Sequence, residues 1–167
     1  MNITQALHQD ATSILELQKL AYQSEAELYG DFRIPPLIQT IDELKRDFTD
    51  KVFLKAQLGG SIVGSARGYQ AGDTCYIERL IVHPDYQRQG IGTALMNQLE
   101  SCFEQVQRFE LFTGDKSDRN IRLYDRLGYK IFKSEEINSN LSFVFMEKCK
   151  FNKPDYCDGG DDGFTIA

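Results

Sequence analysis

Apolar residues recur at two different periods along the chain, and the change between them separates helical from strand-like segments. Residues 2–7 predict a short first strand, and the helical spacing of apolar side chains over 11–30 predicts a helix. Two adjacent prolines within 31–39 stop regular structure, so this segment is expected to be a loop. Thr40 and Glu43 then stand three positions apart, as in a capping box, and predict the start of a second helix.

The period becomes strand-like after this second helix. Residues 51–70 predict two strands joined by a tight turn, because Gly59 and Gly60 suit the backbone of a hairpin. Residues 73–82 predict the next strand, and residues 91–106 return to the helical period. One face of that helix is expected to be apolar and to consist of Ile91, Leu95, Leu99, Cys102, Phe103 and Val106.

The C-terminal part of the chain combines strands with one short helix. Residues 108–114 predict a strand, and residues 117–129 predict a helix that ends with Gly128 as the residue after the C-cap. Residues 130–136 and 141–148 predict an antiparallel pair of strands that closes the fold.

The predicted order is β-αα-βββ-α-β-α-ββ, which indicates a mixed α/β (α+β) fold. Residues 76–112 can form a right-handed crossover between parallel strands, whereas the hairpins make the rest of the sheet antiparallel. We therefore expect a mixed, mostly antiparallel sheet of about seven strands flanked by helices, in one domain at residues 1–148. Residues 149–167 are polar and are expected to form either a flexible tail or a short lid.

The composition limits the class of protein. Of the 167 residues, 41% are hydrophobic and 26% are charged, as in soluble globular domains. The 19 basic and 25 acidic side chains give a net charge of −6, which argues against a nucleic-acid partner held by bulk charge. No run approaches the ~18 apolar residues of a membrane helix, and residues 1–10 have no signal-peptide core. We therefore expect a cytoplasmic protein with no membrane partner.

Metal chemistry is not indicated. The cysteines form no CxxC pair and the chain has only two histidines, although zinc sites need several such ligands at close spacing. We therefore expect no metal, and reduced thiols at Cys75, Cys102, Cys149 and Cys157.

Candidate chemistry lies within residues 83–96, where a strand is followed by a helix. The first N–H groups of a helix lack intrahelical partners and carry the positive end of the helix dipole, so they attract anions. Gly90 and Gly92 remove side chains where a phosphate would approach, although they can equally serve a packed turn. Three possible donors stand beside them: Gln87, Arg88 and Gln89. Leu95 stands at the third glycine position of a dinucleotide fingerprint, and no Gly-Lys-Ser/Thr follows for a P-loop.

Two motifs of this chain resemble those of the GNAT N-acetyltransferases, which use acetyl-coenzyme A. The pyrophosphate motif of the family, Gln/Arg-x-x-Gly-x-Gly/Ala after a Val-x-Pro turn, is matched by residues 87–92 after residues 82–84. The second signature, an Asn and then a Tyr on a short helix before a Gly-aromatic pair, is matched by Asn120, Tyr124 and residues 128–129. The order of elements also agrees, so the resemblance covers the whole predicted domain.

The resemblance implies an acetyl-CoA site between the strand that ends at Val82 and the strand at 108–114, because these strands splay apart in the family. The pantetheine arm would pair with the backbone of Leu80, Ile81 and Val82, and the Val82 N–H would point at the thioester oxygen. The pyrophosphate would bind at the start of the following helix. The other implied cofactor residues are Gln87, Arg88, Gln89, Gly90, Ile91, Gly92, Thr93, Asn120 and Tyr124.

Two residues are candidates for the proton transfers of acetyl transfer to an amine. Tyr124 is the candidate acid that assists the departing thiolate, and Glu78 is the candidate base. In an unbulged strand Glu78 shares a face with Leu80 and Val82, which would carry its carboxylate to the acceptor end of the cleft. A carboxylate with a pKa near ~4.3 is a weak base for an amine near ~10.4, so a water relay and a raised pKa are expected.

Each assignment has a structural alternative. Tyr124 can be a packing residue, and Glu78 can form an ion pair with Arg67 or Arg79. The expected acceptor region is acidic, which favours a cationic amine unless these residues are only solvated surface. Its acidic residues are Glu25, Glu27, Asp31, Glu135 and Glu136.

The leading function is direct attack of a primary amine, from a small molecule or a peptide, on acetyl-CoA in a ternary complex. The rival functions are acyl transfer with another acyl chain or acceptor, and a coenzyme A-sensing module without turnover. A sensing module need not keep both Tyr124 and Glu78, and this chain keeps both. A homodimer is compatible with each of these functions.

Overall fold

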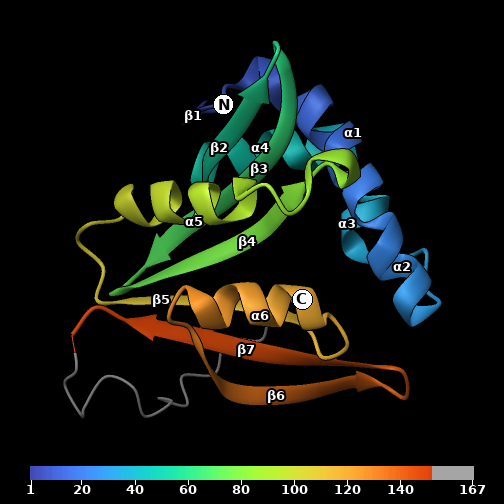
Figure 1. Ribbon diagram of the computed structural model, residues 1–167, viewed down its shortest axis with the longest axis vertical. Coiled ribbons are helices and arrows are strands. Elements are labelled where there is room, and N and C mark those ends of the chain that lie inside the picture. The colour runs from blue at the N-terminus through green and yellow to red at the C-terminus, as the bar shows by residue number, and fades with distance from the viewer. Residues whose placement is uncertain (152–167) are drawn as a thin grey trace.

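Seven strands form one mixed sheet in the computed structural model, which describes residues 1–151 (Figure 1). The order of strands across the sheet is β1-β2-β3-β4-β5-β7-β6. Their bounds are β1 Asn2–Gln5, β2 Val52–Leu58, β3 Ser61–Ala71, β4 Thr74–Val82, β5 Arg108–Gly114, β6 Lys130–Asn138 and β7 Leu141–Cys149. All neighbouring strands are antiparallel except β4 and β5, which are parallel. The predicted mixed, mostly antiparallel sheet of seven strands is confirmed.

Helices cover both faces of the sheet. They are α1 Ala11–Ala21, α2 Gln23–Tyr29, α3 Pro35–Ile38, α4 Ile41–Asp50, α5 Ile91–Ser101 and α6 Asp118–Arg126, with 3-10 turns η1 His8–Asp10 and η2 Pro84–Tyr86. Figure 1 shows α5 in front of β3 and β4, with α6 on the same side over β5 and β7. α5 forms the predicted crossover between the two parallel strands.

The core has one apolar cluster on each face of the sheet. Neighbouring residues of β2 point to opposite faces, so Leu54 joins the cluster under α5 and Phe53 joins the cluster under α1 and α4. Leu95 and Leu99 of α5 are fully buried in the first cluster, and Leu44 of α4 is fully buried in the second. This division places the crossover helix and the N-terminal helices on opposite sides of β4.

The N-terminal helices differ in detail from the prediction. The helix predicted over 11–30 is broken at Tyr22 into α1 and α2. The prediction that 31–39 is entirely loop is wrong, because α3 begins with the two prolines. Proline is tolerated in the first turn, where its missing N–H would have no helical partner. The capping box is confirmed, with Thr40 Oγ1 accepting the Glu43 N–H at 3.3 Å and Glu43 Oε2 accepting the Thr40 N–H at 2.7 Å.

The later turns agree with the predictions from the sequence, but the predicted apolar face of the helix at 91–106 needs one correction. Gly59 and Gly60 form the predicted hairpin turn, with φ angles of 55° and 84°, and Gly128 follows α6 as predicted. α5 ends at Ser101, so Cys102 lies outside the regular helix and is exposed, contrary to the predicted apolar face. The other members of that face are buried: Ile91, Leu95, Leu99, Phe103 and Val106.

A bulge in β4 changes which residues face the helices. Arg79 and Leu80 together oppose a single residue of β3, and Arg79 has a φ of 50°. Beyond the bulge Leu80 and Val82 pack with the cluster under α5, on the same side as the earlier residue Ile77. Glu78 faces α4 instead, where its ion partners lie. The expectation that Glu78 shares a face with Leu80 and Val82 is therefore wrong, because it assumed an unbulged strand.

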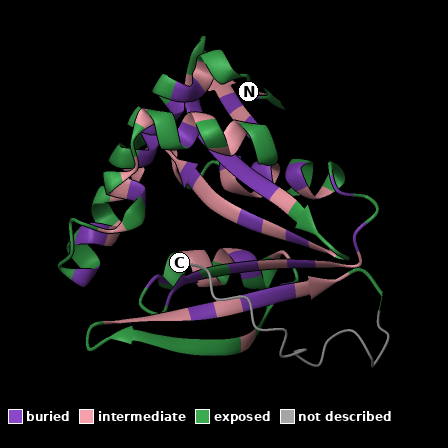
Figure 2. Ribbon diagram, turned by 180° about the vertical axis from the view of Figure 1, so that it is seen from behind, coloured by how far each residue is buried: buried purple, intermediate pink, exposed green. Residues whose placement is uncertain are grey.

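Strand β6 forms an exposed edge of the sheet, and β7 lies between it and β5. Nearly all residues of β6 are exposed (Figure 2). β7 ends at Cys149, and most of the predicted tail, residues 152–167 with Cys157, lies outside the described residues. Within residues 1–151, Cys75 and Cys102 have free thiols as predicted, whereas Cys149 is disulfide-bonded, so the prediction of a reduced thiol is wrong at that position. In the same part of the chain no helix is long and apolar enough to cross a membrane, and no three metal-binding side chains are grouped around a common point.

Candidate active site

The parallel strands β4 and β5 are paired at one end only. Their register joins residues 74–76 to residues 108–110, although both strands continue beyond this segment. Figure 1 shows the two strands diverging toward the side of α2. A cavity of about 400 Å³ lies there, lined by the last residues of β4, the turn before α5, and parts of α2 and α6. The splayed pair implied by the resemblance is present.

Backbone groups of β4 face this divergence. The His83 N–H donates to the Val63 carbonyl of β3 at 2.8 Å, so the backbone at this point faces β3. Backbone groups alternate in direction along a strand, so those of Val82 and Leu80 face the β5 side. On that side, Gln87 Nε2 donates to the Val82 carbonyl at 3.4 Å. An extended ligand between the strands would therefore meet backbone donors and acceptors.

The turn between β4 and α5 leaves open backbone at the end of the cavity. Arg88 and Gly90 have left-handed φ angles of 64° and 79°, a backbone form found in anion-binding nests. Gly90 is also the N-cap of α5 and has no side chain to satisfy the first N–H groups of the helix. A Cβ at Gly92 would lie 3.4 Å from Leu123 Cδ2 and 3.7 Å from Leu80 Cδ2, so a larger side chain would fill this end of the cavity.

Most of the predicted cofactor residues meet at this cavity. Those on its lining are Leu80, Ile81, Val82, Gln87, Arg88, Gly90, Ile91, Gly92, Thr93 and Asn120. Gln89 is exposed and does not line it. Two arginines of α6 also line the cavity and were not predicted from the sequence, Arg119 and Arg126. They stand two helical turns apart, one on each side of the motif residue Asn120, and this spacing was an available signal. Arg119 Nη1 donates to Gln87 Oε1 and joins α6 to the turn.

Tyr124 lies next to the cavity residues but not on the cavity wall. It is 6% exposed, and burial raises the pKa of its hydroxyl above the ordinary tyrosine value, with further contributions from Tyr22 and Glu25. The hydroxyl therefore keeps its proton at neutral pH. Asn120, one turn earlier, is on the wall and donates from Nδ2 to Thr113 Oγ1 at 3.4 Å.

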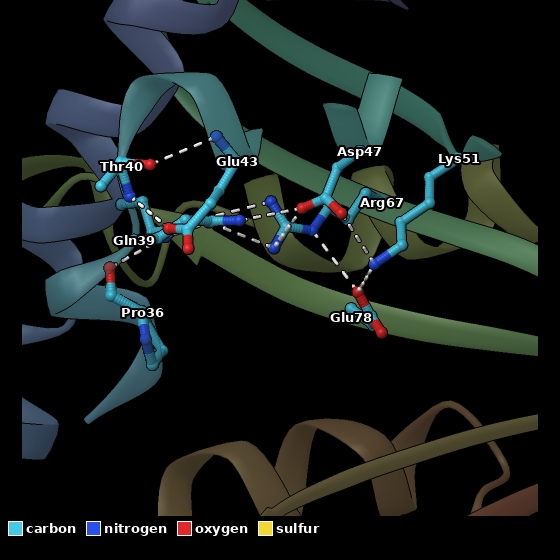
Figure 3. Close-up of polar contacts among 9 residues, drawn as sticks. Pro36, Gln39, Thr40, Glu43, Asp47, Lys51, Arg67 and Glu78 are labelled. Atoms are coloured by element: carbon cyan, nitrogen blue, oxygen red, sulfur yellow. Dashed lines mark hydrogen bonds and ion pairs between the residues drawn. The ribbon is translucent and has the colours of Figure 1, made fainter. Parts of the chain in front are cut away.

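Glu78 belongs to an ion-pair network on the other face of the sheet. Its Oε2 lies 2.8 Å from Lys51 Nζ and 3.5 Å from Arg67 Nε, and Asp47 contacts the same two cations at 3.3 and 3.4 Å. Figure 3 shows these four side chains pointing toward one another below α4. Burial, followed by the charge of Arg79, lowers the pKa of the Arg67 guanidinium, and the two carboxylates oppose this. The structure thus contains the alternative ion pair with Arg67, and the base role of Glu78 stays a prediction.

Helix α2 brings a different carboxylate to the cavity. The Tyr29 ring packs on Gly114 at the end of β5, where any Cβ would collide with it, and its hydroxyl accepts the Lys116 N–H at 2.8 Å. One turn earlier Glu25 accepts the Ser117 hydroxyl at 2.6 Å and lines the cavity. These contacts hold α2 against the segment between β5 and α6. The other acidic residues expected on the acceptor side are exposed and off the lining: Glu27, Asp31, Glu135 and Glu136.

Known proteins share this architecture. The UPF0157 protein YqkA of Bacillus subtilis (strain 168) is 29% identical over 126 residues, or 74% of this chain and 36% of that protein, so the chain spans about a third of this curated relative. An aminoglycoside 6'-N-acetyltransferase complexed with coenzyme A superimposes with a TM-score of 0.73 at 18% identity, over 93% of this chain and 100% of that one. The ribosomal-protein-S18-alanine N-acetyltransferase of Escherichia coli gives 0.71 at 16% identity, over 98% and 99%. At these identities the two structures show a common fold.

Family membership rests on a match across most of the chain. The family model described as the acetyltransferase (GNAT) family matches residues 12–129. That range contains both splayed strands, and it contains the end of β4, the turn before α5, the start of α5 and α6, which form most of the cavity wall. The resemblance drawn from the two sequence motifs is confirmed. The chain belongs to the GNAT acetyltransferase family.

Proposed function

We propose that this protein transfers the acetyl group of acetyl-CoA to a primary amine of a small molecule or peptide. The observation that carries the proposal is the divergence of β4 from β5 beside a turn with left-handed residues and open helix N–H groups. A pantetheine arm would lie along the open backbone edge of β4, as an added strand does. The pyrophosphate would lie at the start of α5, where the helix dipole favours anions.

The residues around the cavity suit this cosubstrate chemically. Its phosphates need positive charge, and the lining supplies three guanidinium groups: Arg88, Arg119 and Arg126. Gly92 leaves the space between Leu80 and Leu123 unfilled, and these two apolar side chains suit the methylene groups of pantetheine. Family membership supports the same ligand.

Two groups of this chain would act on the thioester. The Val82 N–H would donate to the carbonyl oxygen, on which negative charge develops during attack. Tyr124 would donate to the departing sulfur. Full proton transfer from an ordinary phenol to a thiolate is uphill by about 2 kcal/mol, and the raised pKa of Tyr124 increases that cost. We therefore assign the hydroxyl a hydrogen bond that strengthens as the C–S bond breaks.

The acceptor would enter from the side of α2 and attack the thioester directly in a ternary complex. One of the similar structures is named for an aminoglycoside and another for an alanine of a ribosomal protein, which supports an amine of either class. The test is release of free thiol from acetyl-CoA in the presence of polyamines, aminoglycosides and peptides with free N-termini. We expect amine-dependent thiol release with a matching acetylated product. Tight coenzyme A binding without such release would contradict the proposal and favour a sensing module.

A further inference from the structure

We infer that Glu25 binds the ammonium group of the acceptor and takes its proton, so that the site selects cationic amines. The inference rests on the proposed acetyl transfer and names the residue that prepares the nucleophile. Glu25 is half-buried on α2. It is the one acidic side chain among the described residues that line the cavity. A carboxylate at this position meets the acceptor before the acceptor reaches the thioester.

Among the described residues, no cation pairs with the carboxylate of Glu25. Within residues 1–151 it forms no ion pair, and its contact is the Ser117 hydroxyl, at 2.6 Å from one oxygen and 2.8 Å from the other. One hydroxyl supplies one hydrogen, so lone pairs of the carboxylate stay available to a second donor. Ser117 precedes α6 and its side chain makes no capping bond, so the helix dipole also favours a negative charge here. An ammonium ion in the cavity would supply the missing countercharge.

Glu78, in contrast to Glu25, already has cationic partners and lies away from the cavity. Its carboxylate already has two cations, Lys51 at 2.8 Å and Arg67 at 3.5 Å, and it lies on the face of the sheet that packs against α4. It does not line the cavity. The carboxylate of Glu78 is thus already engaged by two cations, whereas that of Glu25 accepts a single neutral hydroxyl. The structure therefore favours Glu25 over Glu78 as the base.

The surroundings of Glu25 also contain the candidate acid. The charge of Glu25 contributes to the raised pKa of Tyr124, which places the two groups within electrostatic reach of each other. The charged and titratable groups around Glu25 are Tyr22, Tyr29, Asp115, Lys116 and Tyr124, with Arg88, Arg119 and Arg126 elsewhere on the cavity lining. A base on the cavity wall and a hydrogen-bond donor next to the cavity residues match what the nucleophile and the leaving group of the reaction require.

The Glu25 carboxylate takes one proton from R–NH₃⁺, and the resulting R–NH₂ attacks the thioester carbon, so that an N–C bond forms. The C–S bond then breaks while the Tyr124 hydroxyl donates a hydrogen bond to the departing sulfur, so that coenzyme A leaves as a thiolate. The nitrogen loses a second proton as it becomes an amide. That proton passes to the thiolate, and Glu25 releases its own proton to water.

The test compares Glu25→Gln with Glu27→Gln, which removes the same charge from an exposed position of the same helix. Thiol release is measured from pH 5 to 9 with two acceptors of different pKa, together with coenzyme A affinity by calorimetry. We expect Glu25→Gln to lower kcat/KM by about 10²-fold and to remove the part of the pH rise that is common to both acceptors. Coenzyme A affinity should stay within about threefold, and Glu27→Gln should match the wild type.

The outcomes separate this inference from the function on which it rests. A wild type without amine-dependent thiol release would overturn the proposed function. An active wild type whose pH profile and kcat/KM are matched by Glu25→Gln would overturn the role of Glu25 alone. Loss of activity in Glu25→Gln together with lost coenzyme A binding would show a damaged fold, and would also count against a role in proton transfer. Partial recovery of kcat/KM in Glu25→Asp would support the carboxylate as the acting group.

Discussion

The ion-pair network of Glu78 allows a quantitative prediction, because one substitution removes a carboxylate charge that pairs with a buried guanidinium. Glu78→Gln keeps the shape of the side chain but leaves Arg67, which is 3% exposed, with Asp47 as its remaining carboxylate. Breaking a fully buried ion pair costs about 3–5 kcal/mol, and a hydrogen bond to a charged group contributes about 1.5–3 kcal/mol. Glu78 is 26% exposed and the amide still accepts a hydrogen bond, so we expect a loss of about 2 kcal/mol.

Thermal and urea unfolding at pH 7 measure this loss. For a domain of this size about 2 kcal/mol corresponds to a decrease in Tm of about 4–8 °C. The matched control is Glu135→Gln, because Glu135 contacts Lys133 at 3.7 Å with both side chains more than half exposed. An exposed pair of this kind contributes about 0–1 kcal/mol, so the control should barely change the Tm.

The same variant separates the structural role of Glu78 from the catalytic one. In the Glu78→Gln enzyme we expect kcat/KM to keep its rise with pH, because the residue faces α4 and does not line the cavity. A Tm equal to that of the wild type would refute the reasoning about the ion-pair network. Loss of the pH rise at an unchanged Tm would restore Glu78 as the base.

Two further predictions concern single side chains. Tyr124→Phe deletes only the buried hydroxyl, so kcat should fall by about 10²-fold with little change in coenzyme A affinity; an unchanged kcat would mean that the thiolate leaves unaided. For Asp10, burial would raise the pKa, but the Lys55 ammonium and the Leu7 amide outweigh it, so the pKa in the folded protein is lowered. The stability that a lowered pKa gives is present in full above the unfolded value of about 3.9, and it is lost as the pH falls from there through the lower folded value. Asp10→Asn should therefore destabilise the protein by about 1–2 kcal/mol at pH 7 and less at pH 3 in urea unfolding, and equal losses at both pH values would contradict this.

The sequence predicts the elements well where the pattern is local. The capping box of Thr40 and Glu43, the glycine hairpin and the turn before α5 each depend on residues close together in the chain, and the structure contains all three. The prolines of α3 were misread because they sit in the first turn, where proline is tolerated.

The parts of the site that sequence reasoning could not supply depend on tertiary contacts. The bulge at Arg79 reverses the direction of the side chains around it, and an arginine gives no warning of a left-handed backbone. Glu25 reaches the cavity because the helical segment is interrupted at Tyr22 and because Tyr29 packs on Gly114, which lies far away in sequence. From spacing alone Glu25 could not be separated from the exposed acidic residues near it.

We propose that acetyl-CoA binds between β4 and β5, with its phosphates at the start of α5. Calorimetric titration of the wild type and of Gly92→Val with coenzyme A and with pantetheine, which lacks the phosphates, tests it most directly. Valine methyl groups at position 92 would occupy the space between Leu80 and Leu123 while the Cβ itself makes ordinary contacts, so the fold should survive. We expect the wild type to bind coenzyme A far more tightly than pantetheine, and the folded variant to lose coenzyme A binding. Equal affinity for the two ligands, or unchanged coenzyme A binding by Gly92→Val, would contradict the claim.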